Sequence, residues 1–291
     1  MSPGSFGSRL FVEFQRLLPA RMLARLIHRV TRCESRWLKD RLISGFIRLY
    51  GVDVSEADAA VPAGYASFNA FFTRRLRSGA RPVAADDSAV VSPADGTIQQ
   101  IGTLDGDSIL QVKGQYYSAA ALLGDPAVAA SFRGGSFATI YLAPWNYHRV
   151  HSPIAGRVVR MTHVPGELWS VNRATAEHVP GLFARNERLV CECAGPYGAF
   201  AVVLVGALNV GSISTAWAGA VLPTPPGVPA GSVHEYGNDG PVIERGGELG
   251  QFNMGSTVVL LLPPGTAAWE AGLSAGTTVR VGMQIGRMLR C

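Results

Sequence analysis

The sequence has no apolar run long enough to cross a membrane. Its longest uninterrupted apolar stretches, such as residues 199–205 and 258–262, fall far short of the roughly 20 residues that a spanning helix needs. The N-terminus also lacks the continuous apolar stretch and the small-residue cleavage site of a secretory signal. The sequence therefore predicts a protein without a transmembrane helix that stays in the cytoplasm.

Cysteine and lysine are both scarce. The four cysteines are Cys33, Cys191, Cys193 and Cys291. They do not form the two pairs of a zinc site, and Cys191 and Cys193 fall in an expected strand, on one face. We expect structural thiols, with no disulfide framework and no metal site. The two lysines, Lys39 and Lys113, do not lie in a Met-Lys-Met hairpin, which argues against a biotinyl-type carrier.

Charged residues make up only 16% of the chain and hydrophobic residues 47%, so the chain can bury a sizeable core. The net charge of +5 is unevenly distributed. Residues 1–48 contain ten Arg and Lys but three acidic residues, so the remainder of the chain is slightly acidic. Because that remainder is not basic, the sequence does not predict binding to nucleic acid.

Residues 9–50 are expected to form helices with an asymmetric surface. Apolar residues recur there at helical spacing, namely Met22, Leu23, Leu26, Ile27 and Val30. An adjoining basic stripe contains Arg21, Arg25, Arg29, Arg32 and Arg36. A helix of this kind is typical of an interfacial membrane segment, although a helix packed on its own domain has the same pattern. We favour a membrane-associating helical segment at residues 1–50 and leave the second interpretation open.

The rest of the chain, residues 51–291, is expected to be rich in β-strands. It contains most of the 34 glycines and 18 prolines, and short apolar runs alternate with Gly/Pro turns. The expected strands include residues 136–142, 189–193, 199–205 and 257–262.

A faint internal repeat links residues 92–98 and 152–158, which both read Ser-Pro-x-x-Gly-x-(Ile/Val). Residues 281–286 resemble the closing half-motif of biotinyl/lipoyl-type barrels. We therefore predict an α+β fold: a β-rich, barrel-sandwich-like catalytic core with an N-terminal amphipathic helical segment.

Three separated segments carry residues suited to catalysis. Ser256 follows Gly255 at the entrance to an apolar strand, where its hydroxyl can be bent toward the preceding carbonyl. Such a step is common in strand-entry turns, but a serine near a base can act as a nucleophile. His148, His151 and Asp95 supply the remaining parts of a constellation that is recognised by geometry rather than chain order.

These motifs resemble those of the bacterial phosphatidylserine decarboxylases, self-processing enzymes whose cofactor is a pyruvoyl group made from an internal serine. The matching segments are residues 68–76, Arg81-Pro82, residues 112–114, 122–124 and 182–188, and the Gly-Ser-Thr step. The chain departs from the family at Met254, where leucine is usual. It departs also at Trp145-Asn146, since an aspartate commonly precedes the tyrosine.

The resemblance implies self-cleavage between Gly255 and Ser256 into a large chain, residues 1–255, and a small chain, residues 256–291. Ser256 Oγ would attack the Gly255 carbonyl, with His151 as the base and Asp95 holding its tautomer. The new terminus would carry the pyruvoyl cofactor. This carboxy-lyase would form a Schiff base with phosphatidylserine and release CO2 and phosphatidylethanolamine, with His148 protonating the carbanion.

Ser170 and Val171 match a family segment near the substrate pocket. The expected partners are phosphatidylserine in an anionic membrane and the two chains of one precursor, and the sequence leaves a homo-oligomer open. The expected location is the cytoplasmic face of the cell membrane, as a peripheral protein.

Two other enzyme classes remain open. A triad serine hydrolase acting on lipid or peptide would use the same residues, but Ser256 lacks a Gly-x-Ser-x-Gly elbow. A soluble amino-acid decarboxylase with the same cofactor would not explain the basic amphipathic N-terminus.

Overall fold

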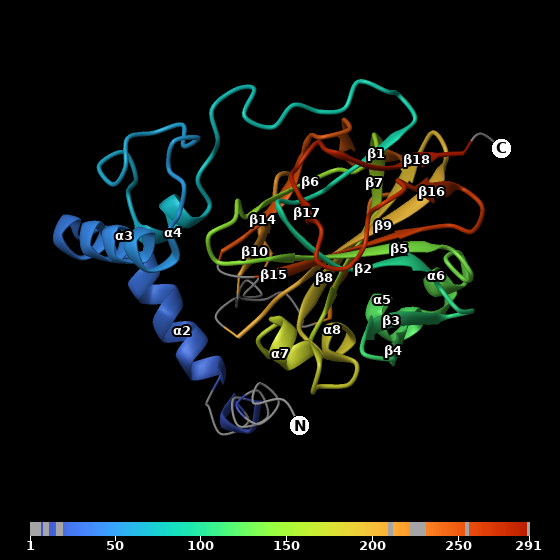
Figure 1. Cartoon of the computed structure of the whole chain (residues 1–291), viewed down its shortest axis with the longest axis horizontal. Coiled ribbons are helices and arrows are strands. Elements are labelled where there is room, and N and C mark those ends of the chain that lie inside the picture. Colours follow the sequence, from blue (N-terminus) through green and yellow to red (C-terminus); the bar gives the residue numbers. More distant parts are fainter. Residues whose placement is uncertain are drawn as a thin grey trace.

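The computed structural model describes residues 7, 12–15, 20–208, 212–221, 231–253 and 256–289. Helices near the N-terminus stand beside a β-rich body (Figure 1), so the predicted α+β class is confirmed. None of the helices in these ranges is long and apolar enough to cross a membrane.

The helices expected within residues 9–50 are present. Helix α2 spans Ala20–Thr31 and α3 spans Arg36–Tyr50. Helix α3 ends at Gly51, whose φ of 62° places it in the left-handed region that glycine tolerates. The short helix α4, Phe68–Phe72, begins after Ser67, whose side chain accepts a hydrogen bond from the Ala70 N–H.

An aromatic core joins α3 to α4. Its buried members are Ile43, Val52, Tyr65, Phe68, Phe71 and Phe72. In contrast, the apolar side of α2 is poorly covered, since Met22 is 67% exposed and Leu26 58%. The α3–α4 core therefore anchors the helical segment to the body, while much of the apolar surface of α2 faces outward.

A nine-stranded antiparallel sheet forms the centre of the body. Its main path runs β12 (Val233–Glu235), β7 (Gly156–Val164), β8 (Arg188–Gly195), β9 (Gly198–Val205), β15 (Ser256–Leu262), β5 (Ser136–Leu142), β2 (Gly96–Thr103) and β17 (Thr278–Val279). Strand β13 (Val242–Ile243) pairs with β7 off this path. The four strands expected from the sequence are confirmed, and the sheet is open because β12 and β17 are different ends of the path.

Strand β15 lies between β5 and β9, and all seven of its residues are buried. This explains why the sequence of β15 is an almost continuous apolar run rather than an alternating one.

Smaller sheets surround the central one. One has the order β11 (Gly219–Ala220), β10 (Ile213–Thr215), β14 (Glu248–Phe252) and β6 (Arg149–His151). Another contains β1 (Ala89–Val91), β18 (Gln284–Met288) and β16 (Ala267–Trp269), and β3 (Ser108–Val112) pairs with β4 (Gln115–Ser118). The remaining short helices are α5 (Ala119–Leu123), α6 (Pro126–Ala130), α7 (Arg173–Ala176), α8 (Leu182–Arg185) and the 3-10 turn η1 (Gly237–Asp239).

The two Ser-Pro segments of the internal repeat form the same turn. Ser92 Oγ donates to the Ala94 carbonyl at 2.7 Å, and Ser152 Oγ donates to the Ile154 carbonyl at 2.6 Å. The turns also bond to each other, because the His151 N–H donates to the Pro93 carbonyl at 2.8 Å. The repeat thus brings the neighbourhoods of Asp95 and His151 together.

Each Ser-Pro turn is held by a glycine with positive φ. Gly282, at φ +83°, donates from its N–H to the Ser92 carbonyl at 3.2 Å, and Gly246, at φ +76°, donates to the Ser152 carbonyl at 2.8 Å. A Cβ on Gly282 would lie 2.5 Å from the Pro82 carbonyl oxygen, so a side chain is excluded there. The half-motif at residues 281–286 therefore closes onto the first turn.

Candidate active site

Ser256 is the first residue of β15 and is fully buried. Its backbone pairs with Leu142 of β5, while its Oγ has no hydrogen-bond partner among the described residues. A buried hydroxyl without a partner costs about 1–3 kcal/mol, so such a group is a candidate for function. Gly255 and Met254 lie outside the described residues.

His148 lies just before β6 and is also fully buried. Its ring stacks on Phe72 of α4, with 4.0 Å between centroids. Nε2 lies 3.3 Å from the Pro144 carbonyl, which can only accept, so we assign the hydrogen to Nε2. Nδ1 is then a buried acceptor that has no partner within the described ranges.

Burial lowers the pKa of His148 to about 3, because the charged imidazolium is poorly solvated there. The nearby charge of Arg74 acts in the same direction, while the hydrogen bond to Pro144 opposes it. The ring is therefore neutral near pH 7, with Nδ1 unprotonated.

His151 ends β6 and is partly buried. Its Nδ1 lies 2.7 Å from the Gly246 carbonyl and its Nε2 lies 3.1 Å from the Tyr147 hydroxyl. We assign the hydrogen to Nδ1, which leaves Nε2 as the acceptor. Burial lowers the pKa of His151, although the bond to Gly246 and the charges of Glu248 and Asp95 oppose this shift. A neutral imidazole with an unprotonated Nε2, which here accepts from the Tyr147 hydroxyl, suits a general base once that hydroxyl moves.

Asp95 is buried and paired mainly with Arg81. The guanidinium donates from Nε to Oδ1 at 2.9 Å and from Nη2 to Oδ2 at 2.6 Å, and the Val281 N–H donates to Oδ1 at 2.8 Å. Arg81 also donates to Glu56 at 2.8 Å. Burial opposes the charge of Arg81, but its hydrogen bonds to Asp95 and Glu56 raise its pKa. The Gly246 carbonyl holds the Nδ1 side of the histidine base, so the role expected for Asp95 stays a prediction.

A network of polar side chains stabilises the end of β14, which lies just before the Met-Gly-Ser segment at residues 254–256. The side-chain amide of Asn253 donates to Ser212 Oγ at 2.8 Å, and Asn69 of α4 donates to Asn253 Oδ1 at 3.1 Å. Arg149 of β6 bonds Glu248 of β14 at 2.7 Å. The backbone on the N-terminal side of this segment is therefore held by side-chain hydrogen bonds, and β15 on the other side is held by its strand pairing.

Sequence reasoning missed the supporting residues, although several lay inside the motifs that were noticed. Tyr147 adjoins His148, Arg81 precedes Pro82, and Asn69 lies in residues 68–76. Arg81 and Asn69 contact residues 14 and 184 positions away in the sequence, so no local pattern identifies them. Tyr147 contacts His151 only four positions away, but the spacing alone does not show that contact.

The backbone hydrogen bonds of Ser170 and Val171 lead to other parts of the fold. Gln15 accepts from the Ser170 N–H at 2.9 Å, and Gln99 donates to the Val171 carbonyl at 3.2 Å. Their assignment to the substrate pocket stays a prediction. At the departure from the family pattern, Asn146 Oδ1 accepts from the Ala143 N–H at 2.8 Å, a bond that an aspartate carboxylate can also accept.

The cysteines do not suggest a reactive site. Cys33, Cys191 and Cys193 are free thiols, and burial raises the pKa of Cys191, which disfavours the reactive thiolate. Cys291 lies outside the described residues. Within the ranges described, no group of three His, Cys, Asp or Glu residues is placed to hold a metal ion.

The features described are a buried serine hydroxyl, two histidines of lowered pKa and an aspartate paired with an arginine. The chain belongs to the phosphatidylserine decarboxylase family, whose model matches residues 68–287. A further model, described as PSD, matches residues 10–51.

Relatives named phosphatidylserine decarboxylase proenzyme cover almost the whole chain. The protein of Methylococcus capsulatus is 47% identical over 96% of this chain and 96% of its own length. The protein of Pseudomonas paraeruginosa is 50% identical over the same shares. That of Ectopseudomonas mendocina is 49% identical over 96% of this chain and 98% of its own length. The similarity extends through both the helical segment and the β-rich body.

The burial of His148 predicts a pH dependence. Its folded pKa lies below the unfolded value of about 6.5, so below pH 6.5 the unfolded chain binds a proton that the folded chain does not. In a Ser256→Ala precursor, we expect the His148 ring to stay neutral from pH 8 to pH 4 in NMR spectra of labelled histidine. The free energy of unfolding should fall as the pH drops below 6.5, and His148→Gln should reduce that fall. A His148 ring that becomes charged near pH 6.5 would contradict this.

Proposed function

We propose that the protein is a phosphatidylserine decarboxylase that first cleaves itself between Gly255 and Ser256. The observation that carries this proposal is the buried Ser256 hydroxyl, which has no hydrogen-bond partner in the part of the chain that the structure describes and which begins the central strand. Relatives at 47–50% identity are named proenzymes of this activity, which favours it over a triad hydrolase.

In the precursor, Ser256 Oγ would attack the Gly255 carbonyl while His151 takes the hydroxyl proton at Nε2. The assigned tautomer supports this role, because the Gly246 carbonyl keeps the other nitrogen protonated. Tyr147 occupies Nε2 in the precursor structure, so this hydroxyl must move or pass the proton on. Asp95 would stabilise the charged imidazolium through its negative charge.

The cofactor implied by the family resemblance is a pyruvoyl group made from Ser256. A buried, unpaired oxygen at the start of a rigid strand fits a group that must form from this side chain. When present, it supplies a ketone for the substrate amine and an acceptor for the electrons released with CO2.

His148 would move a proton at Nδ1. This nitrogen is unprotonated in the buried site. The lowered pKa makes the imidazolium a strong acid, so a proton that reaches Nδ1 during the reaction would pass readily to the carbon that has lost CO2.

Cleavage would leave the two chains bound to each other. Strand β15 of the small chain lies between β5 and β9 of the large chain and is buried along its whole length. Separating the chains would expose that apolar strand to water.

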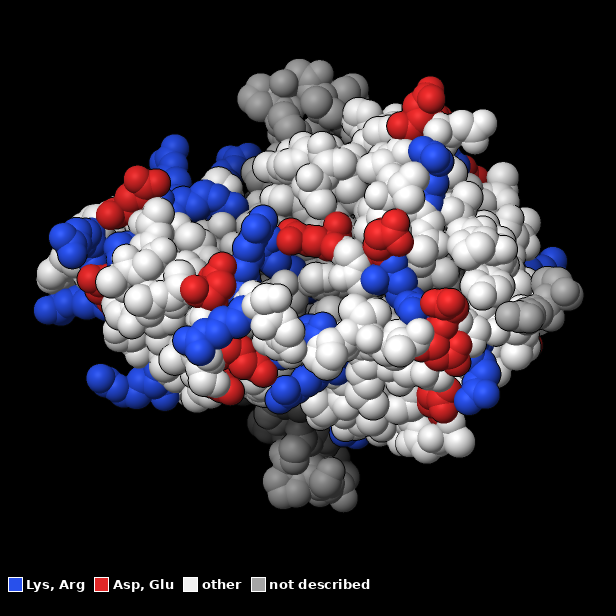
Figure 2. All heavy atoms as spheres, turned by 90° about the horizontal axis from the view of Figure 1, so that it is seen from above, with Lys and Arg blue, Asp and Glu red and all other residues white. Residues whose placement is uncertain are grey.

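The helical segment, residues 1–50, would hold the catalytic residues 51–291 at the anionic leaflet on the cytoplasmic face of the membrane. Exposed Met22 and Leu26 lie on the same helix as exposed Arg25 and Arg29. Lys and Arg side chains gather toward the helical end of the molecule (Figure 2). An exposed apolar face beside arginines suits peripheral binding to anionic lipid.

The first prediction concerns the cleavage itself. On denaturing gels and by intact mass, the wild-type protein should separate into residues 1–255 and 256–291, with a pyruvoyl group on the smaller chain. Ser256→Ala should stay intact because the nucleophile is gone. An intact chain with full decarboxylase activity, or a free serine at the new terminus, would contradict the proposal.

Substitutions of His148 and His151 should affect different steps, decarboxylation and self-cleavage respectively. Asp95→Ala and His151→Ala should slow self-cleavage about 1000-fold or more, since triad members act as a unit. His148→Ala should still cleave but lose decarboxylation per processed molecule. The exposed His234→Ala serves as the matched control and should behave as wild type. Normal processing in all three active-site variants would exclude these roles.

Attachment to lipid should depend on charge. Each Lys or Arg near an anionic surface contributes about 1 kcal/mol, and the attraction is screened by salt. Arg25→Gln with Arg29→Gln should weaken co-sedimentation with phosphatidylserine vesicles, and the loss should be largest at low salt. Arg133→Gln with Arg173→Gln removes the same charge elsewhere and should have little effect. Binding that ignores both salt and the α2 substitutions would mean that α2 does not contact lipid.

A further inference from the structure

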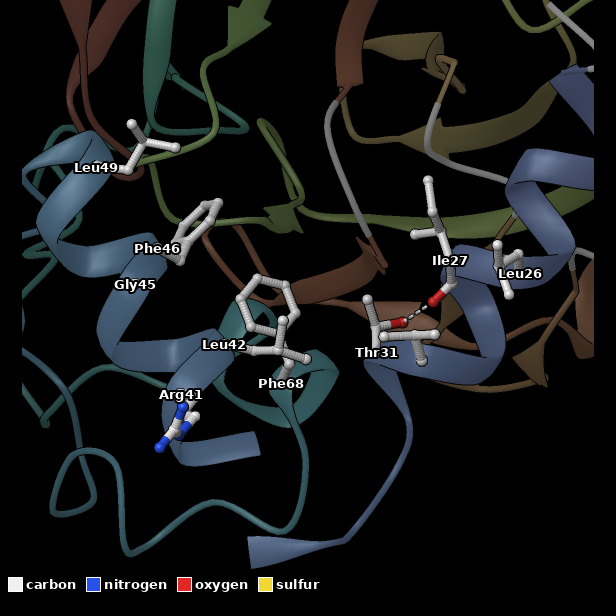
Figure 3. Close-up of a pocket in the computed structure, with 10 residues that line it drawn as sticks. Leu26, Ile27, Thr31, Arg41, Leu42, Gly45, Phe46, Leu49 and Phe68 are labelled. Carbon is white, nitrogen blue, oxygen red and sulfur yellow. Dashed lines mark hydrogen bonds between the residues drawn. The ribbon is translucent and has the colours of Figure 1, made fainter. Parts of the chain in front are cut away.

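An apolar groove of about 470 Å³ separates α2 from α3 and reaches α4. Its walls include Leu26, Ile27 and Val30 of α2, and Leu42, Phe46 and Leu49 of α3 (Figure 3). The volume lies in the range of small-molecule and lipid pockets. The groove is therefore large enough for a flexible hydrocarbon chain.

The groove offers almost no polar partner. The Thr31 hydroxyl in its lining already donates to the Ile27 carbonyl at 2.7 Å (Figure 3). Arg41 is the charged residue of the lining, and its guanidinium lies 4.6 Å from the centre of the Trp37 ring. A peptide or a polar headgroup would leave its hydrogen-bonding groups unsatisfied against such walls, whereas a hydrocarbon would not.

A row of aromatic rings connects the groove with the reaction site. Phe46 of the groove lies 5.8 Å from Phe72, centroid to centroid, and Phe72 lies 4.0 Å from the His148 ring. Phe68 belongs both to the groove and to α4. In a phospholipid whose headgroup reaches His148, the phosphate, the glycerol and an ester separate the reacting carbon from the hydrocarbon. The groove provides apolar surface beyond Phe72, on the side away from His148.

We propose that this groove binds one acyl chain of the phospholipid substrate. The inference rests on the proposed decarboxylase function and adds a second binding site to it. Charge complementarity supports a lipid occupant over a second copy of the chain. The exposed Arg25 and Arg29 of α2 are the sequence neighbours of Leu26 and Val30 in the groove lining, and they suit the anionic headgroups of neighbouring lipids. The acyl site would retain one substrate molecule while its headgroup reacts.

Gly45 provides a direct test. It lies inside α3 and lines the groove, and a Cβ added there would meet no atom within 4 Å. Glycine is unfavourable within a helix, so a larger residue should fill the groove without destabilising the fold. Gly45→Phe is therefore the test variant. Ser44→Phe adds the same ring to a neighbouring exposed position outside the groove lining and is the matched control.

The processed enzyme would be assayed with dioleoyl-phosphatidylserine in mixed micelles and with water-soluble dibutyroyl-phosphatidylserine. Each methylene kept out of the groove should cost about fourfold in affinity. We expect Gly45→Phe to raise KM for the long-chain substrate at least about tenfold and to leave kcat, self-cleavage and the short-chain KM within about twofold. Ser44→Phe should match wild type with both substrates.

Other outcomes would overturn the acyl site. An unchanged long-chain KM, or equal changes for both substrates, would exclude it. A parallel loss of vesicle binding would show instead that the groove is a face inserted into the bilayer, and a changed sedimentation mass would show a contact between copies. A wild-type protein that neither cleaves nor decarboxylates either substrate would refute the proposed function itself.

A measurement on the wild-type protein keeps the test independent of any folding defect in the variant. Phosphatidylserine with a photoactivatable group near the end of one acyl chain should label peptides from α2 and α3, and unlabelled dioleoyl-phosphatidylserine should compete. Labelling confined to other segments would exclude the site.

Discussion

The burial of β15 between two neighbouring strands is the constraint on which the rest of the site depends. All seven of its residues pair with β5 and residues 257–261 also pair with β9, so β15 cannot shift along the sheet without breaking both ladders. The Ser256 hydroxyl is consequently held in the interior, without a partner among the described residues. Asn253 and its partners hold the chain that precedes the Met-Gly-Ser segment. For the self-cleavage proposed above, such a fixed position would favour attack on the preceding carbonyl.

The two Ser-Pro turns explain how a carboxylate and an imidazole separated along the chain come near each other. Their backbones bond directly, and each is closed by a glycine that occupies the left-handed region. Asp95 and His151 are then oriented by different groups, Arg81 and the Gly246 carbonyl. This division differs from a triad in which the carboxylate bonds the histidine, and it leaves Asp95 to act on His151 through charge.

The stack of Phe72 on His148 connects the helical segment to the chemistry. The ring of Phe72 belongs to the aromatic core that joins α3 to α4, and it helps to exclude water from the imidazole. The same burial that makes His148 neutral therefore comes from the elements that line the apolar groove. Substrate hydrocarbon and reacting headgroup would be bound on the two sides of one aromatic wall.

The sequence alone determined the α+β class, the strands at residues 136–142 and 199–205, and the Ser-Pro repeat, because periodicity and turn residues act locally. The motifs around Asp95, His151 and Ser256 also pointed to one family. Only the tertiary structure decided what each side chain contacts. The pairing of Arg81 with Asp95 and the stack of Phe72 on His148 join segments that are distant in the chain. The lowered pKa of His148 arises from burial, which depends on how those segments pack and which no local pattern of residues encodes.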